Sequence, residues 1–428
     1  MPFNPPPTTR RRFLASFLSL AAAPAEGFSL SGKKRARDLG KVYEYLQDGH
    51  LRAKELGRQR VSIKSVDFTD SKFESTSWQY FDFVDCDFAG MFSIRLEWLT
   101  ESTFTNCNFR GILELGDTRD VRFINCAMVV NGDGGITFSS RSTGLVFEGC
   151  TFRNSNYDRN HVGGILCAGE ISFIDCKAQG FALGGDKKLI LRKCVTINGH
   201  LDTASIGGYW SNRDEMPYSD FLLEDCDFTR GVVATNLELN SFTIRNCKLG
   251  LFETARSTVR NNMLIENIKE GHFDLSRTDF QGKLTVKNCS FSRLHDGHSF
   301  WCPSIVIPYV LIENVVSKSY PANISGATDD MAEKDRLTVT KNKSTIIRDC
   351  NISHLHLNWM QSEYMRIENC TIDTLLIRNG RIGKLEIIGC KLMKLDVSNT
   401  QVKEQDVRVP AGCETIATGS NIKLLPRE

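Results

Sequence analysis

The stretch IKSVDFTDSKFESTSWQYFDFVDCDF, residues 63–88, decides the fold. Large apolar residues recur in it at every fifth position, namely Ile63, Phe68, Phe73, Trp78, Phe83 and Phe88. A period of five matches neither an α-helix, with 3.6 residues per turn, nor a β-strand, with a period of two. The stretch therefore indicates a repeat architecture rather than an ordinary globular domain.

This spacing resembles the pentapeptide-repeat family, in which a small residue, Asp or Asn, and Leu or Phe precede two variable positions. Val66, Asp67 and Phe68 form one such unit, and Cys86, Asp87 and Phe88 form another. The resemblance implies that four units make one square coil with the large residue pointing inward. The C-terminal end repeats the pattern over three coils: Ile347, Ile352, Leu357, Ser362; Ile367, Ile372, Ile377, Ile382; and Ile387, Leu392, Val397, Val402.

Between the two ends a single marker persists, apolar-x-Asn/Asp/Gly-Cys-x-apolar. It occurs at Cys86, Cys107, Cys126, Cys150, Cys176, Cys194, Cys226, Cys247, Cys289, Cys350, Cys370 and Cys390, with a weaker last apolar position at Cys176 and Cys194. Ile268 and Val315 stand in the Cys position of two more coils. We therefore predict an all-β fold, a right-handed parallel β-helix solenoid of about 14–15 coils of 20–21 residues. At the usual strand spacing such a rod is roughly 70 Å long.

Twelve of the 15 cysteines occupy the marker position of this repeat. Stacked coils bury a continuous column of inward side chains, and a buried cysteine packs as a small hydrophobe. Parallel side chains in such a column point the same way, so we expect reduced thiols rather than disulfides. No Cys-x-x-Cys pair is present, and we expect no metal and no cofactor.

Four regions are predicted along the chain. Residues 1–25 resemble a twin-arginine signal peptide, with Thr9-Arg10-Arg11-Arg12-Phe13-Leu14 before a short apolar run and Ala23-Pro24-Ala25. Residues 26–62 form a helical N-terminal cap, because Leu39, Val42, Tyr43 and Leu46 recur at helical spacing. Residues 63–403 form the β-helix with loop insertions, and residues 404–428 a C-terminal cap or tail. The signal implies a periplasmic or secreted protein.

Partners are restricted by charge and hydropathy. Lys and Arg number 53 against 51 Asp and Glu, which gives no electrostatic argument for nucleic acid. The apolar run of the signal is too short to span a membrane. Whether the signal is removed, and the oligomeric state, stay open.

Insertions between coils are the candidate functional face, because loops on a solenoid carry function more often than coils do. The longest interruptions separate Cys194 from Cys226 and Val315 from Cys350. The first brings aromatic rings beside charged groups, a combination expected of ligand sites. The candidate ligand-binding residues are Tyr209, Trp210, Arg213, Asp214 and Glu215, with Tyr157, Asp158, Arg159 and His161 from an insertion two coils away.

Other polar groups give weaker signals. His295 and His298 with Asp296 lack a convincing third metal ligand. Asp329 and Asp330 resemble the paired carboxylates of glycoside-cleaving sites, yet adjacent loop residues are usually solvated. The run RIENCTID, residues 366–373, resembles coils of the pectate lyases and polygalacturonases. The calcium-binding Asp clusters and Gly-His-Gly motifs of those enzymes are absent from the sequence.

Two functions remain open at this point. The first is an exported, non-catalytic scaffold or binding protein of the cell envelope or extracellular space that contacts glycans through its insertions. The second is a carbohydrate-active enzyme, a polysaccharide lyase, epimerase or hydrolase, whose catalytic residues cannot be named from the sequence. A DNA-mimicking pentapeptide protein requires a strongly acidic surface, which this composition excludes.

Overall fold

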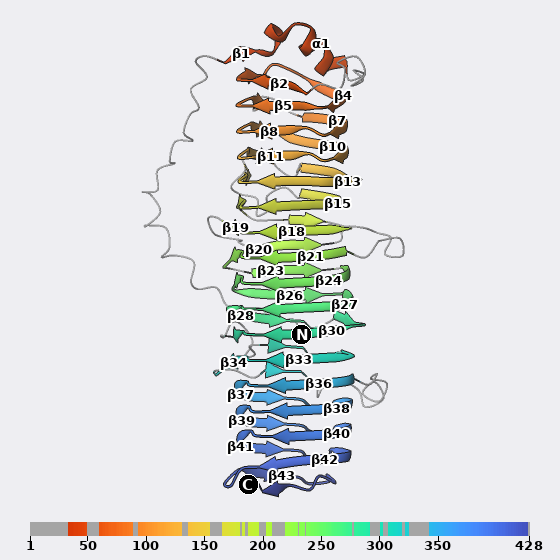
Figure 1. The fold of residues 1–428 in the computed structure, drawn as a ribbon, viewed down its shortest axis with the longest axis vertical. Helices are drawn as coiled ribbons and strands as arrows, with labels where there is room; N and C mark the ends of the chain where they lie inside the picture. The colour runs from red at the N-terminus through yellow and green to blue at the C-terminus, as the bar shows by residue number, and fades with distance from the viewer. Residues whose placement is uncertain are drawn as a thin grey trace, which may run out of the picture.

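The computed structural model describes residues 33–48, 60–88, 93–130, 136–154, 165–179, 182–184, 187–196, 203–207, 219–229, 231–235, 237–275, 278–291, 300–302, 307–318, 322–324 and 342–426. These residues form a parallel β-helix with one short α-helix, α1 (Lys41–Asp48), and one turn of 3-10 helix, η1 (Ala36–Leu39). All strand pairings are parallel, and the strands stack as rungs along one axis (Figure 1). The predicted fold class is confirmed.

The first sheet runs the whole length of the β-helix, each strand pairing with the next. Its strands are β2 (Val61–Lys64), β5 (Phe81–Val84), β8 (Thr103–Thr105), β11 (Arg122–Ile124), β13 (Ile136–Glu148), β15 (Ile165–Ile174), β18 (Lys188–Arg192), β21 (Ser219–Glu224), β24 (Glu238–Arg245), β27 (Ser257–Glu266), β30 (Lys283–Lys287), β33 (Tyr309–Glu313), β36 (Asn342–Arg348), β38 (Gln361–Glu368), β40 (Arg381–Ile388) and β42 (Gln401–Val409).

The second sheet follows the marker cysteines and stacks in the same way. Its strands are β3 (Val66–Asp67), β6 (Asp87–Phe88), β9 (Asn108–Arg110), β12 (Ala127–Val130), β14 (Thr151–Asn154), β16 (Lys177–Ala178), β19 (Val195–Thr196), β22 (Asp227–Phe228), β25 (Lys248–Leu249), β28 (Lys269–Asp274), β31 (Ser290–Phe291), β34 (Val316–Ser317), β37 (Asn351–His356), β39 (Thr371–Leu376) and β41 (Lys391–Asp396).

The third sheet closes each coil and shares its longer strands with the other two. Its own strands are β4 (Phe73–Gln79), β7 (Ser93–Thr100), β10 (Ile112–Arg119), β17 (Ala182–Gly184), β20 (Thr203–Gly207), β23 (Gly231–Thr235), β26 (Leu251–Ala255), β32 (Phe300–Trp301), β35 (Ala322–Asn323) and β43 (Glu414–Ile416). Three further short strands each pair with one strand of these sheets: β1 (Lys34–Arg35) with β3, β29 (Thr278–Phe280) with β27, and β44 (Leu425–Pro426) with β42.

The fourteen marker positions occupy one column inside the β-helix. Each lies two residues after the end of a first-sheet strand, and all fourteen are buried. The twelve cysteines among them, called the cysteine column below, form no disulfide. Each thiol instead donates to the carbonyl oxygen two residues earlier, with Sγ–O distances of 3.0–3.5 Å. The cysteines are therefore packing residues, as their spacing predicts.

Aromatic residues form neighbouring inward columns in the first coils. Phe83, Phe104, Phe123, Phe147 and Phe173 stack ring on ring, with centroids 4.8–5.2 Å apart and planes within 11° of parallel. Stacking of identical residues at the coil spacing is what an in-register parallel ladder imposes. The period-five residues of the opening stretch, from Ile63 to Phe88, are all buried.

The residue before each marker turns the chain from the first sheet into the second. All fourteen of these residues have a positive φ, between 50° and 68°. Thirteen of them are asparagine, aspartate or glycine, which tolerate this left-handed conformation best, and the fourteenth is Lys193. Their amides also bond along the axis: Asn246 Nδ2 donates to Asp225 Oδ1 at 3.0 Å, and Asn267 Nδ2 to Asn246 Oδ1 at 2.9 Å.

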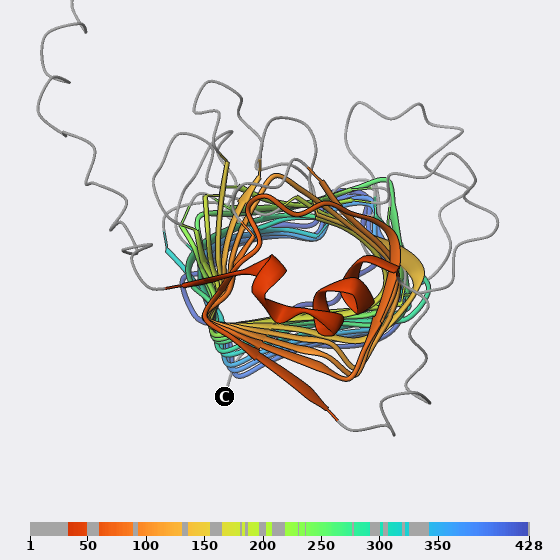
Figure 2. The same cartoon turned by 90° about the horizontal axis from the view of Figure 1, so that it is seen from above.

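The N-terminal cap covers the first coil (Figures 1 and 2). Leu46 of α1 is fully buried, and the buried Trp78 donates its Nε1 proton to the Leu46 carbonyl oxygen at 3.1 Å. The cap also contains a strand that the helical periodicity does not predict, because β1 pairs with β3 at the open edge of the second sheet. Residues 26–32 and 49–59 of the predicted cap, and the whole predicted signal peptide, lie outside the described residues.

The C-terminal region continues the ladder. β42 extends to Val409, β43 pairs with β41, and β44 pairs with β42. In the last turn a side chain takes the place of a neighbouring strand. The Asn421 side chain accepts a hydrogen bond from the Val402 amide and donates one to the Val402 carbonyl, each at 2.8 Å. These bonds satisfy backbone groups that a final coil leaves exposed.

Candidate functional site

The nine candidate ligand-binding residues all lie outside the described residues: Tyr157, Asp158, Arg159, His161, Tyr209, Trp210, Arg213, Asp214 and Glu215. The same holds for His295, Asp296, His298, Asp329 and Asp330. The structure therefore neither joins nor separates them, and their role stays a prediction.

The described ends of the insertions do show where the chain leaves the β-helix. Residues 155–164 and 292–299 follow the second-sheet strands β14 and β31, whereas residues 208–218 and 325–341 follow the third-sheet strands β20 and β35. The chain rejoins the coils at the start of a first-sheet strand after residues 208–218 and 325–341, at Ser219 of β21 and Asn342 of β36. The insertions therefore leave the β-helix at two different corners.

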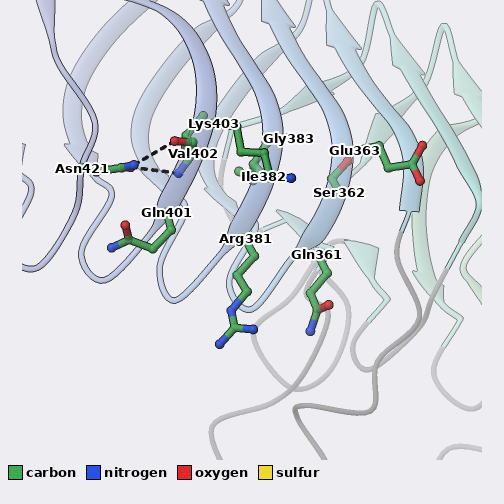
Figure 3. Close-up of a pocket in the computed structure, with 10 residues that line it drawn as sticks. All are labelled: Gln361, Ser362, Glu363, Arg381, Ile382, Gly383, Gln401, Val402, Lys403 and Asn421. Atoms are coloured by element: carbon green, nitrogen blue, oxygen red, sulfur yellow. Dashed lines mark hydrogen bonds between the residues drawn. The ribbon is translucent and has the colours of Figure 1, made fainter.

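A groove crosses the outer surface of the last coils, next to the place where the chain returns at Asn342. Its volume is about 560 Å³, and it is built from three successive first-sheet strands, β38, β40 and β42 (Figure 3). The lining residues are Gln361, Ser362, Glu363, Arg381, Ile382, Gly383, Gln401, Val402, Lys403 and Asn421. Ser362, Ile382 and Val402 are buried and form its floor.

The polar side chains of the groove recur once per coil. Gln361, Arg381 and Gln401 are in-register neighbours on the three strands and point the same way in Figure 3. Gln401 donates to the Gly419 carbonyl oxygen at 2.8 Å. The side chains of Gln361, Glu363, Arg381 and Lys403 form no hydrogen bond or ion pair with any described residue. Their donors and acceptors are therefore available to a ligand.

Gly383 keeps the groove open at its centre. It lies between Glu363 and Lys403 on the neighbouring strands, and a Cβ atom at this position would sit 2.4 Å from the Glu363 carbonyl oxygen. No larger residue fits without a backbone shift. No side chain therefore stands between Glu363 and Lys403 on the intervening strand.

A cluster of ionised groups flanks the groove on the same strands. Glu386 accepts from the Tyr364 hydroxyl at 2.6 Å and pairs with Lys384 Nζ at 2.8 Å and Arg366 at 3.3 Å. The bonds from Lys384 and Tyr364 lower the pKa of Glu386, while burial and the bond to Glu386 raise the pKa of Tyr364. Both groups therefore keep their usual charge at neutral pH, and neither is tuned as a general acid or base.

On eight successive first-sheet strands, one outward position is always charged, and the sign of the charge alternates from each strand to the next. We call this set the charge ladder; it consists of Arg192, Glu224, Arg245, Glu266, Lys287, Glu313, Arg348 and Glu368. Ion pairs join Glu224 to Arg192 at 2.6 Å and to Arg245 at 2.5 Å, Glu266 to Lys287 at 2.8 Å, and Glu313 to Arg348 at 2.6 Å. Sequence reasoning missed the ladder, although each member is the variable residue two places before a marker.

Two further properties concern the described residues only. No helix among them is both long and apolar enough to cross a membrane. They also contain no group of three or more His, Cys, Asp or Glu side chains arranged to hold a metal ion.

Comparison with known proteins does not assign the chain to a family. No family model matches the chain, and no curated protein or solved structure is significantly similar to it.

Proposed function

We propose that this protein is an exported, non-catalytic β-helix scaffold that binds glycans of the cell envelope or extracellular space. The observation that carries the proposal is the groove on the last coils, whose polar side chains recur at the coil spacing of about 4.8 Å. Four of them, Gln361, Glu363, Arg381 and Lys403, have no partner among the described residues. A sugar chain along the solenoid axis presents hydroxyl groups at regular intervals, and amide, guanidinium and carboxylate groups bind hydroxyls directly.

The composition of the groove favours binding over hydrolysis. Glycoside hydrolases position two carboxyl groups on either side of the scissile bond. Among the ten lining residues Glu363 is the one carboxylate. The alternative of a carbohydrate-active enzyme therefore depends on the insertions, where Asp329 and Asp330 lie.

The insertions belong to the same proposal. Residues 325–341 end beside Asn342, which pairs with Ser362 of the groove floor, so this insertion returns to the coils one rung from the groove. We propose that Trp210 and Tyr209 of the 208–218 insertion supply stacking faces for sugar rings. Export through the twin-arginine pathway and kinship with pentapeptide-repeat solenoids are parts of the proposal that rest on the sequence motifs.

A glycan array followed by calorimetry on the mature protein tests this function. We expect Arg381→Ala combined with Lys403→Ala to lower the affinity for the bound glycan at least about tenfold, because each removes an unpaired donor from the groove. Lys391→Ala is the matched control, since Lys391 is exposed on the same coil but lies on β41, outside the groove. Trp210→Ala tests the insertion separately.

Three results would count against the proposal. An array without signal removes glycan binding altogether. Unchanged affinity in all the variants places the binding site elsewhere. Release of new reducing ends or unsaturated sugars from a bound polysaccharide would show that the protein is a carbohydrate-active enzyme and not a non-catalytic scaffold.

A further inference from the structure

The outer face of the first sheet between β18 and β38 carries three columns of outward residues. The charge ladder is one edge of this face. The middle column is mainly apolar and half-buried: Ile190, Leu222, Thr243, Leu264, Thr285, Leu311 and Ile346, ending at Arg366. The third column is polar and contains Lys188, Asp220, Ser241, Asn262, Lys283, Tyr309, Ser344 and Tyr364.

We propose that this face binds a second copy of the chain in an antiparallel, two-fold symmetric dimer. The two-fold axis runs parallel to the strands and passes between the coils of Glu266 and Lys287. Such an axis reverses the order of the coils but places each column opposite the same column of the partner. An isologous contact of this kind requires a surface complementary to itself.

The charge ladder meets that requirement. It has an even number of members with strict alternation, so reversal of its order places every cation opposite a carboxylate. Arg192 faces the position of Glu368, Glu224 that of Arg348, Arg245 that of Glu313, and Glu266 that of Lys287. The ladder is also bounded by isoleucine at both ends, Ile174 and Ile388, which face each other in the same arrangement.

The other two columns are compatible with the same axis. In the middle column Leu222 faces the position of Ile346, and Leu264 faces that of Thr285. In the third column Asp220 faces the position of Ser344, and Lys188 that of Tyr364. No like charges meet in any of the three columns.

The alternative two-fold axis, along the solenoid, fails on charge. It keeps each coil opposite itself and places the charge ladder opposite the third column. Lys188 then faces the position of Arg192, and Lys283 faces that of Lys287. Because like charges opposed across an interface cost affinity, the antiparallel arrangement is favoured.

The size of the face suits a dimer. Five-residue strands are about 17 Å long, and eight coils span about 34 Å, which gives an outline of roughly 600 Å² on each partner. Accessible area exceeds flat outline, and a standard interface buries about 800 Å² per partner. The half-buried leucines and isoleucines supply its apolar centre.

Sedimentation velocity of the mature protein at low ionic strength is the direct test. We expect a dimer whose dissociation constant rises with salt. Lys287→Glu should raise the dissociation constant at least about 100-fold, because it places two pairs of like charges at the centre of the interface. Lys394→Glu is the matched control: Lys394 forms an equivalent ion pair at 2.7 Å with Glu414, has the same 34% side-chain exposure as Lys287, and lies on β41.

A charge swap separates the interface from the fold. Glu266→Lys combined with Lys287→Glu restores opposite charges across the dimer axis, although it opposes like charges along the ladder. We expect dimerisation to return while the melting temperature stays below that of the native protein. A monomeric native protein, a Lys287→Glu variant that stays dimeric, or a swap that leaves a folded monomer overturns the proposal.

Discussion

The residue before each cysteine of the column shows how one position sets the path of the chain. Its positive φ makes the corner between the first and second sheets. Where it is asparagine, as at Asn246 and Asn369, its side-chain amide bonds to the same position of a neighbouring coil. Gly149 replaces asparagine where space is short, because a Cβ there would lie 2.2 Å from Asn125 Oδ1. The motif therefore combines a conformational and a packing requirement at adjacent positions.

Cys370 tests the packing part of the motif. We expect Cys370→Ala to lower the free energy of unfolding by about 1–2 kcal/mol, since it removes one small buried group. Cys370→Asp should cost much more, because an unpaired charge would enter a dry column. Urea denaturation measures both values. A Cys370→Asp variant as stable as Cys370→Ala would contradict the buried position.

The cysteines should also be unreactive in the folded protein. Cys289 lies between Ile268 and Val315 in the column, and burial raises its pKa to about 12. The Cys289 thiol is therefore protonated at neutral pH, and burial closes the whole column to solvent, so we expect slow reaction with a soluble thiol reagent until the protein unfolds. Cys413, which is only partly buried, should react first among the described cysteines. A rapid reaction of most of the 15 thiols in the native state would argue against this packing.

Glu224 gives the charge ladder a pH dependence. Its bond to Arg192, with the neighbouring Arg245, lowers the pKa of its carboxyl below the usual value. The unfolded chain therefore takes up the proton first, and the stability that the ion pairs contribute is lost as the pH falls through the folded pKa. We expect Glu224→Gln to cost about 1 kcal/mol above pH 5 and less near pH 3. Thermal melts across this range measure the difference, and an equal loss at every pH would exclude ionisation as its cause.

At the scale of elements, the first and last coils need different solutions from the interior coils. An end coil exposes apolar side chains and unpaired strand edges, which promote aggregation. At the N-terminus α1 covers the core, while β1 pairs with β3 and provides hydrogen-bond partners for its backbone. At the C-terminus β43, β44 and the Asn421 side chain take these roles.

Leu46 tests the N-terminal cap. We expect Leu46→Asp to detach α1 from the first coil, because the substitution buries a charge at a fully buried position beside Trp78. Exposed Trp78 should then shift its fluorescence to longer wavelength, and light scattering should rise with time. Lys41→Asp is the control, since Lys41 is exposed on the same helix. Equal behaviour of the two variants would show that the helix does not protect the coil.

At the scale of the whole molecule, the stacked core and the predicted export pathway are physically connected. The column places reduced thiols on adjacent coils, and thiols of an unfolded chain are open to oxidation in an oxidising compartment. Folding before export, which the resemblance to twin-arginine signals implies, buries these thiols first. The proposed destination is therefore compatible with a cysteine-rich but disulfide-free core.

Replacement of Arg10, Arg11 and Arg12 by Lys tests the pathway. The three substitutions keep the charge but remove the guanidinium groups that the resemblance implies are recognised. We expect the precursor to accumulate in the cytoplasm, which fractionation and immunoblotting measure. Normal amounts of the variant in the periplasm would exclude this route.

The class of fold, the inward columns, the corner residues and the presence of a terminal helix could all be predicted from the amino-acid sequence. Each of these is a local or periodic feature: the five-residue period defines the inward positions, and the marker shows where each coil turns. The corner at which an insertion leaves could not be predicted throughout, because its distance from the marker does not show whether the chain first forms a third-sheet strand such as β20 or β35.

Only the tertiary structure decided which outward residues become neighbours. Partners in the charge ladder are separated by 32 residues between Arg192 and Glu224 but by 21 between Glu224 and Arg245, because insertions of different length leave the coils between them. The groove likewise needs Gly383 placed between Glu363 and Lys403 on three different strands. The physical reason is that buried apolar positions are constrained by the repeat itself, whereas contacts on the surface depend on the register in which whole coils stack.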